Sequence, residues 1–283
     1  MERVVALDAQ ATAPAVPRAI TRTIDLASPG SLADAIDRDD VDTLVHLGYL
    51  AGAGAQGDSL PVLDAIVAAV AVRPIPKLVF TSSTTIYRAL PGDPTYSDED
   101  TVLATDARSE WVQDKVRADR RIRELALEVD AAVTCLRFGL VVGTPVRTFI
   151  TEYLGRKAVP VVDGQDPSLQ CVHERDVVSA LVHAVKSTQE GTYNIVGEGA
   201  LPLSMALRAG RRRAAPVPEL GSYPLHPALW EPDLDKVPEA IHDLFRFNWV
   251  ADGSRAHDEF EFQSQVSSRE TVDDFYRRLD AKS

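Results

Sequence analysis

The chain has 283 residues, 45% of them hydrophobic, and a formal net charge of −12. That length can bury one large core and a smaller lobe, while the negative charge argues against nucleic acid or an anionic membrane as a partner. No apolar run reaches the ~18 residues of a membrane-spanning helix, and the first residues lack a signal-peptide pattern. Cys135 and Cys171 both fall in apolar, strand-like segments, as buried reduced thiols do. We therefore expect a cytoplasmic protein.

The first third of the chain alternates strand-like and helix-like segments. Short apolar runs predict strands at residues 3–8, 19–25 and 42–48. Ser31 stands where it can cap a helix over residues 32–37. The first two strands end in the carboxylates Asp8 and Asp25. Strands that alternate with helices predict a parallel sheet.

A glycine-rich stretch follows the third predicted strand. Residues 52–57 match Gly-x-Gly-x-x-Gly and precede a predicted helix over residues 60–71. This pattern is typical of a pyrophosphate-binding loop only when a tight turn joins strand to helix. Here the first glycine does not follow the strand directly, and the next strand ends in Ser82 and Ser83 instead of an acid. We expect a loop over the crevice of the sheet, with the pyrophosphate loop as the alternative.

The most informative stretch runs from Lys77 to Lys115. Apolar residues predict a buried strand over residues 77–83, which runs directly into a cluster of serine and threonine hydroxyls. A charge-rich helix is predicted over residues 109–129, and it carries Trp111 and Lys115 near its start. Hydroxyls at the carboxyl end of a strand, with a lysine on a nearby helix, indicate a site at the crevice of a doubly wound α/β sheet.

The remaining chain predicts the last strands of the sheet and a smaller lobe. Further strands are expected at residues 131–137, 158–162 and 191–197, and helices at residues 149–154, 177–186 and 269–279. We expect a nucleotide-binding domain over residues 1–143, whose last strands return from residues 158–200, and an interleaved lobe over residues 144–283. His173 and Asp176 lie three apart without a third ligand type nearby, so no metal site is expected.

These motifs together resemble the extended short-chain dehydrogenase/reductases, the family of NAD-dependent sugar-nucleotide epimerases and dehydratases. In that family a strand reads Ser-Ser-x-x-Val-Tyr-Gly, which Ser82 to Tyr87 match, with Arg88 at the glycine position. The family's helix motif is Tyr-x-x-x-Lys. Lys115 matches its lysine, while Trp111 stands at the tyrosine position. The resemblance implies a Rossmann-like fold with a small C-terminal substrate lobe.

The resemblance also implies roles for residues along the carboxyl edge of the sheet. Asp8 would accept hydrogen bonds from the adenosine ribose, although a strand-ending turn residue is the alternative. Asp25 and Leu26 would lie against the adenine, and the backbone at Leu47 and Gly48 would run beside NAD or NADP. Ser83 would orient the reacting oxygen, and Lys115 would hold the nicotinamide ribose. A sugar nucleotide is the implied ligand, and the family allows a homodimer.

Two departures from the family bear on activity. An indole donates a hydrogen bond but neither accepts one nor titrates, so Trp111 cannot replace the catalytic tyrosine. Tyr87 is the candidate substitute, with structural packing as the alternative. The first strand and its Gly-x-x-Gly-x-x-Gly loop are missing ahead of residue 3. Either the sheet closes up over the missing strand, or the true start lies upstream. We expect weak or absent binding of NAD or NADP by the chain as written.

Two functions remain open on this basis. The first is an NAD(P)-dependent sugar-nucleotide epimerase or dehydratase with impaired or altered catalysis. The second is a catalytically silent relative that acts as a nucleotide sensor or a protein-interaction scaffold. Trp111 and the missing glycine loop favour the second function, while Ser83 and Lys115 favour the first.

Overall fold

The computed structural model describes residues 3–10, 19–48, 59–89, 96–105, 110–144, 146, 148–217 and 246–281. Its first half contains β1 (Val4–Asp8), β2 (Ala19–Thr23), α1 (Pro29–Asp39), β3 (Thr43–His46), α2 (Leu60–Val72), β4 (Lys77–Ser83), the 3-10 helix η2 (Thr84–Ile86), α3 (Glu110–Glu128) and β5 (Ala132–Phe138). The second half contains β6 (Leu140–Val142), α4 (Phe149–Gly155), β7 (Ala158–Val162), β8 (Ser168–Leu169), β9 (Cys171–His173), α5 (Glu174–Lys186), β10 (Gly191–Ile195), β11 (Leu201–Pro202), α6 (Leu203–Ala209), β12 (Arg213–Val217), α8 (Ser254–Asp258) and α9 (Ser268–Asp280).

The centre of the molecule is a four-stranded parallel sheet in the order β10-β5-β4-β3. It confirms the predicted α/β class with a mainly parallel sheet. The strand predicted at residues 77–83 is β4, with the same bounds. β5 begins and ends one residue later than predicted. Both segments are almost entirely buried, as a continuous apolar run in a parallel sheet requires.

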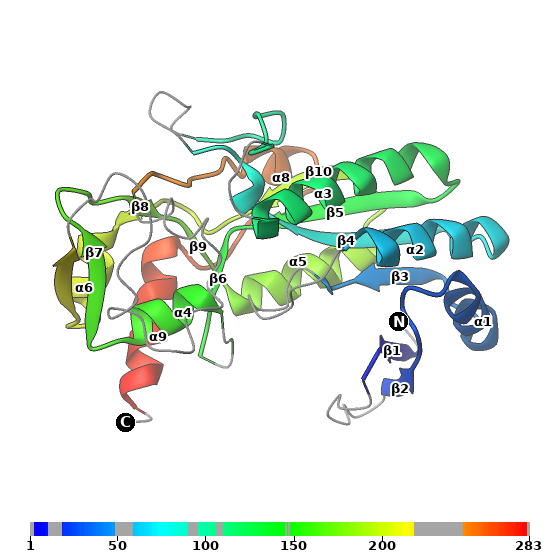
Figure 1. Ribbon diagram of the computed structural model, residues 1–283, viewed down its shortest axis with the longest axis horizontal. Coiled ribbons are helices and arrows are strands. Elements are labelled where there is room, and N and C mark those ends of the chain that lie inside the picture. Colours follow the sequence, from blue (N-terminus) through cyan, green and yellow to red (C-terminus); the bar gives the residue numbers. More distant parts are fainter. Residues whose placement is uncertain are drawn as a thin grey trace.

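Helices cover both faces of this sheet (Figure 1). Leu78 and Phe80 of β4 pack in one cluster with residues of α1, α2 and α3. Val79, between them, packs on the opposite face with Val177 and Ala180 of α5. Alternate residues of a strand point to opposite faces. The three layers are therefore α1, α2 and α3 on one side, the sheet, and α5 on the other.

The strands β1 and β2 form a separate parallel pair. Among the described strands, β1 pairs only with β2, and β3 pairs only with β4. The pair is joined to α1 because Arg22 of β2 donates two hydrogen bonds, of 2.7 and 2.6 Å, to the buried carboxylate of Asp39. In Figure 1 the pair lies beside the β3 edge, with β1 on the nearer side. Among the described residues, the two parallel groups are therefore not joined by a ladder between β1 and β3.

Two helices begin earlier than predicted because of their caps. Ser28, not Ser31, is the N-cap of α1: its side chain accepts a hydrogen bond from the Ser31 N–H, and Pro29 occupies the first helical position. α5 begins at Glu174, three residues before the predicted start, because the His173 ring accepts a hydrogen bond from the Arg175 N–H. In both cases the cap that forms lies one turn nearer the amino terminus than the expected start.

The smaller lobe is built from three short strand pairs, β6-β9, β7-β12 and β8-β11, and from helices α4, α6 and α9. Cys171 lies in its core and Cys135 in the core of the sheet, and both are free buried thiols. A strap of residues 246–252 crosses between lobe and sheet: Trp249 bridges Leu169, and Ala251 bridges Ser97. No helix in the described ranges combines the length and apolarity needed to span a membrane.

Candidate functional site

Ser83 lies where β4 ends and η2 begins, at the carboxyl edge of the sheet. Its side-chain oxygen accepts hydrogen bonds from the Thr85 N–H, at 3.3 Å, and the Thr85 hydroxyl, at 2.9 Å. These bonds cap η2 and fix the rotamer of a half-buried hydroxyl whose own proton can still be donated. The structure therefore holds Ser83 in place at the position that the sequence predicts.

Trp111 and Lys115 lie one turn apart on α3, which packs against η2. The Lys115 ammonium sits over the indole of Trp111, 4.5 Å from the ring centroid. The indole also makes an edge-to-face contact with Phe149 of α4, with ring centroids 6.5 Å apart. Trp111 thus joins the Rossmann-like half of the protein to the smaller lobe. The ring occupies the boundary between them, and the almost fully buried Lys115 lies against its face.

Burial lowers the pKa of Lys115 from 10.5 to about 8, against an opposing effect of the neighbouring Asp114 carboxylate. A lysine with such a pKa is partly neutral near physiological pH. Asp114 itself accepts hydrogen bonds from the N–H and the hydroxyl of Ser59, at 3.1 and 2.6 Å. The start of α2 is therefore attached to α3 directly beside Lys115.

The Tyr87 side chain lies in the protein core and is hydrogen-bonded to two other buried side chains. Its hydroxyl donates to the Asn194 side-chain oxygen, at 2.7 Å, and accepts from the Arg137 guanidinium, at 2.8 Å. Burial raises the pKa of Tyr87 to about 12, with Arg137 opposing the shift. Only 1% of the residue is exposed. This geometry favours the structural interpretation of Tyr87 over the catalytic one.

The polar network around Tyr87 extends through the protein interior. Arg137 makes a two-pronged contact with Asp119, at 2.9 and 2.6 Å, and Asp119 also accepts from the Ser82 hydroxyl at 2.8 Å. The same guanidinium donates to the main-chain carbonyl of Glu99, at 2.9 Å. Sequence reasoning assigned no role to this network. The signal that could have found it is an arginine near the end of a largely apolar, buried strand, since a buried charge needs a partner.

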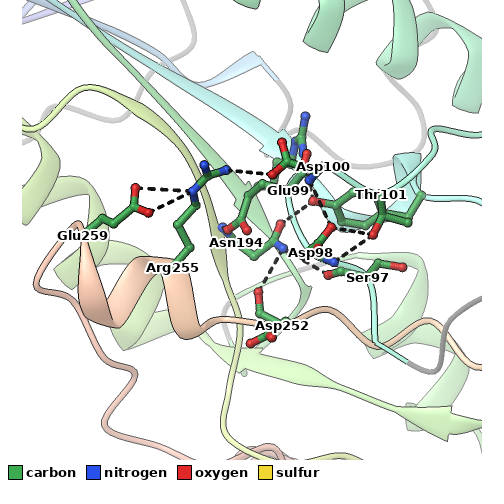
Figure 2. Close-up of polar contacts among 11 residues, drawn as sticks. Ser97, Asp98, Glu99, Asp100, Thr101, Asn194, Asp252, Arg255 and Glu259 are labelled. Carbon is green, nitrogen blue, oxygen red and sulfur yellow. Dashed lines mark hydrogen bonds and ion pairs between the residues drawn. The ribbon is translucent and has the colours of Figure 1, made fainter.

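Figure 2 shows how the network reaches the strap. The carboxylate of Glu99 accepts a 2.6 Å hydrogen bond from the Asn194 N–H. The Asn194 amide donates to the carbonyls of Ser97 and Asp252, at 3.2 and 3.0 Å. Burial raises the pKa of Glu99. One asparagine at the end of β10 therefore joins the loop at Ser97, the strap and Tyr87.

The residues expected on the adenosine side of a cofactor lie at the carboxyl ends of the first strands. Asp8 accepts a 2.8 Å hydrogen bond from the Gln10 N–H, and Asp25 accepts a 3.0 Å bond from the Ala27 N–H. Both carboxylates are turn residues, and both are exposed, so their remaining lone pairs face solvent. Leu26 packs at the edge of the same apolar cluster as α1 and α2.

Leu47 and Gly48 follow β3, and Leu47 is half exposed. A side chain at Gly48 would meet the His46 ring, because an added Cβ would lie 2.8 Å from its Nε2 atom. Burial lowers the pKa of His46 to about 4, so the ring is neutral at physiological pH. A neutral, buried imidazole supports the interpretation of His46 as a core residue.

These residues meet only part of what a dinucleotide requires. Asp8 and Asp25 can face the adenosine half, and Lys115 can face the other ribose. A pyrophosphate needs several backbone N–H groups at a helix N-terminus, and no glycine loop stands in that position among the residues that the structure describes. The glycine motif at residues 52–57 lies outside them. The described residues therefore do not by themselves complete a NAD site.

The parallel sheet, the hydroxyls at the end of β4 and the lysine on α3 define a Rossmann-like dehydrogenase-related fold. A sequence model of the NAD dependent epimerase/dehydratase family matches residues 1–196, and the chain belongs to that family. Uncharacterized proteins of Mycobacterium bovis and Mycobacterium tuberculosis are 29% identical to it over 290 residues, which cover 98% of this chain and 77% of each relative.

Solved structures of sugar-nucleotide enzymes share the fold. The dTDP-glucose 4,6-dehydratase of Bacillus anthracis, in complex with NAD, superposes with a TM-score of 0.72 at 14% identity, covering 99% of this chain and 89% of that one. The UDP-glucose 4-epimerase of Thermotoga maritima, with UDP-glucose, gives 0.72 at 14% identity, covering 99% and 91%. The UDP-glucose 4-epimerase of Thermus thermophilus, with NAD, gives 0.72 at 16% identity, covering 99% and 92%. At these identities the likeness establishes the fold alone.

Proposed function

We propose that this protein binds a nucleotide or sugar nucleotide along the carboxyl edge of its sheet and carries out little or no hydride transfer. In this function it senses the ligand or presents it to a partner. Family membership supports the ligand class, since two of the solved structures that share the fold hold NAD and another holds UDP-glucose. The exposed carboxylates of Asp8 and Asp25 are the groups that would face the ribose and the base.

The observation that carries this proposal is the position of Trp111. Its indole fills the boundary between sheet and lobe, under the Lys115 ammonium and against Phe149. A titratable phenol is absent from that position, and general acid–base help is worth roughly 10²–10⁴ in rate. Tyr87 does not supply the missing group, because its hydroxyl is held by Asn194 and Arg137 in the core.

A second function is favoured by one other observation. Lys115 is buried beside the site with a pKa lowered to about 8, and Ser83 is fixed at the end of β4. An amine that is partly neutral can accept a proton from a hydroxyl. This pair supports altered catalysis as an NAD(P)-dependent epimerase or dehydratase, with Lys115 in place of the tyrosine.

Two measurements separate these functions. Calorimetry with UDP-glucose tests binding, and NAD reduction with a set of sugar nucleotides tests turnover, for the wild type and Trp111→Tyr. We expect binding without turnover in the wild type, and any gained turnover only in the tyrosine variant. Wild-type turnover equal to that of Trp111→Tyr would overturn the silent-site proposal, and loss of that turnover in Lys115→Met would favour the second function. Absence of binding to any nucleotide would overturn both.

A further inference from the structure

The longest uninterrupted basic run of the chain, Arg211 to Arg213, lies at one end of the smaller lobe. It joins α6 to β12, and Figure 1 shows α6 and β7 at the end of the molecule opposite to α1. Two main-chain hydrogen bonds bring further basic residues to the run. The Arg211 N–H donates to the Arg208 carbonyl at 3.1 Å, and the Arg213 N–H donates to the Lys157 carbonyl at 3.0 Å. Basic residues from α6, from the run itself and from the position before β7 therefore lie together.

Most of these cations are exposed and have no partner among the described residues. The exposed ones are Lys157, Arg208, Arg211 and Arg213. Arg212 differs, because its guanidinium packs on the Tyr276 ring and pairs with Asp280 at 3.1 Å. No other carboxylate of the described ranges pairs with this group. The four exposed cations therefore form a positively charged surface on a chain whose net charge is −12.

The end of α6 does not need these cations as caps. Basic side chains often bond the last carbonyls of a helix. Here main-chain N–H groups already do so: the Gly210 N–H donates to the Ala206 carbonyl at 3.3 Å, and the Arg212 N–H donates to the Leu207 carbonyl at 2.8 Å. The exposed guanidinium groups are therefore not explained by helix capping.

Arg211 adopts a backbone conformation that favours glycine. Its φ is 53°, in the left-handed region, at the position that follows the Gly210 cap of α6. The glycine of this turn stands one residue earlier, where an added Cβ would meet the Tyr276 ring at 2.3 Å. An arginine in the left-handed region lowers stability relative to glycine. Strain of this kind points to a use for the side chain that is found there.

An apolar side chain borders the cations. Met205 lies three positions before Arg208 on α6 and is 40% exposed. Residues three apart on a helix are neighbours on one face. Methionine adapts its shape to its partner and is common at protein-binding surfaces. We call this surface the basic patch, and it consists of Lys157, Met205, Arg208, Arg211 and Arg213.

We propose that the basic patch binds an acidic polypeptide segment of a partner protein, with carboxylates on the four cations and an apolar side chain on Met205. Charge complementarity of this kind orients partners and speeds their encounter. Because the net charge of the chain is −12, an acidic segment is attracted at the patch and repelled elsewhere. None of the patch residues belongs to the carboxyl edge of the sheet, so this proposal and the proposed nucleotide binding can fail separately.

Two other polyanions fit the patch less well. A nucleic acid duplex presents dense charge along its whole length, which the acidic remainder of the protein repels. Membrane-binding helices enter the headgroup region with a broad apolar face, whereas α6 has 7 residues and exposes one large apolar side chain, that of Met205. An acidic peptide can contact the patch alone, and arginine binds carboxylates in a two-pronged geometry.

Peptide binding by the full chain tests this proposal. The probe is a short fluorescein-labelled peptide that repeats Glu-Glu-Leu, and its match repeats Glu-Glu-Ser; fluorescence anisotropy measures the binding of both. The patch variant combines Arg208→Gln, Arg211→Gln and Arg213→Gln. The control variant loses the same charge from exposed arginines on three separate helices, by Arg38→Gln, Arg120→Gln and Arg175→Gln.

At low ionic strength we expect the wild type to bind the leucine peptide, and the patch variant to bind it at least about tenfold more weakly. The control variant should bind within about twofold of the wild type. The affinity should fall as salt is raised above about 0.1 M, where the Debye length is about 10 Å. Met205→Ser should weaken binding of the leucine peptide by about threefold and leave the serine peptide unchanged.

Three results would overturn the proposal. The first is no binding of the leucine peptide by the wild type at low ionic strength. The second is an equal loss of affinity in the patch variant and the control variant, since net charge alone would then account for binding. The third is tighter binding of a DNA duplex, or of vesicles that contain phosphatidylserine, through the same three arginines.

Arg211→Gly separates binding from folding. Glycine is favoured at a φ of 53°, so this change should raise the midpoint of urea unfolding. It should also weaken binding of the leucine peptide by about threefold. Stability and affinity then change in opposite directions, which a variant that merely unfolds cannot produce. Unchanged peptide affinity in Arg211→Gly would remove Arg211 from the binding surface and overturn the proposal as stated.

Discussion

Arg137 and Asp119 form a two-pronged ion pair in which neither side chain reaches solvent. The guanidinium belongs to the last residue but one of β5, and the carboxylate projects from α3. The pair therefore attaches the helix that carries Lys115 to the centre of the sheet. Because Arg137 also donates to Tyr87 and to the Glu99 carbonyl, the loop before α3 depends on the same contact.

Replacing only Arg137 should strongly lower the free energy of unfolding. Arg137→Ala leaves the buried Asp119 carboxylate with only the Ser82 hydroxyl and the half-exposed Arg123 as partners, and a broken buried pair costs about 3–5 kcal/mol. Urea denaturation should show that loss in the free energy of unfolding. The double change Arg137→Met with Asp119→Leu should lose less than Arg137→Ala alone, because no charge remains unpaired. A double variant as unstable as the single one would show that hydrogen bonds, not the buried charge, dominate.

Lys115→Met should stabilise the protein at pH 7. The pKa of Lys115 is lowered from 10.5 to about 8, so the folded protein binds fewer protons than the unfolded chain between those values. The free energy of unfolding of the wild type therefore rises as the pH increases from about 8 to 10.5. Below pH 8 the buried Lys115 destabilises the folded protein to its full extent. At pH 7 the free energy of unfolding of the variant should exceed that of the wild type by on the order of 1–3 kcal/mol. Above pH 10.5 the difference should be small. Denaturation curves of the wild type and the variant at pH 7 and above pH 10.5 measure this difference. A stabilisation that does not depend on pH would contradict the prediction.

Tyr87→Phe should destabilise the protein without altering ligand binding. The change leaves the Asn194 oxygen and one Arg137 N–H without their partner in the core, which costs about 1–3 kcal/mol. The Tyr87 carbonyl, which accepts from the Trp249 indole N–H at 3.2 Å, is unaffected. Thermal unfolding measures the loss, and calorimetry with UDP-glucose measures binding. A fall in any turnover larger than the loss of folded protein would reassign Tyr87 to catalysis.

NAD should bind the chain from Met1 weakly. The part of the chain that the structure describes offers no row of backbone donors to a pyrophosphate, and each such hydrogen bond is worth roughly 1.5–3 kcal/mol. We therefore expect a dissociation constant near the millimolar range. Titration calorimetry with NAD is the measurement, and Asp8→Ala should weaken what binding remains by about tenfold. Leu127→Ala is the control, because Leu127 is exposed at the C-terminal end of α3, away from the carboxyl ends of the strands. Micromolar binding to the wild type would show that another element, with residues 52–57 as the candidate, holds the phosphates.

The sequence alone is sufficient to predict an element that is buried on all sides. A continuous apolar run identifies β4 to the residue, because a strand buried on both faces has no alternation to interpret. The N-caps Ser28 and His173 were missed because several residues near each helix start can cap a helix, and the sequence alone does not select one.

The candidate site likewise contains residues that local motifs predict and contacts that they do not predict. Ser83 and Lys115 follow from local motifs at the end of one strand and the start of one helix. The contact between Tyr87 and Asn194 joins residues 107 positions apart and has no periodic signature, so no local pattern indicates it. The separate β1-β2 pair likewise depends on which strand lies next to which, a property of the assembled sheet.

The strap has a consequence for how the protein is made. The indole of Trp249 reaches back 162 positions to the carbonyl of Tyr87, and Gln170 holds Ala251 by two further bonds, of 3.0 and 2.8 Å. Domains fold amino terminus first as they leave the ribosome, at roughly 5–20 residues per second. The sheet can therefore form early, but the loop at Ser97 gains its final partners only after residue 252 has emerged. Ribosome-bound chains that end before Trp249 should therefore carry a formed sheet while the Tyr87 carbonyl and the Gln170 side chain still lack their partners from the strap.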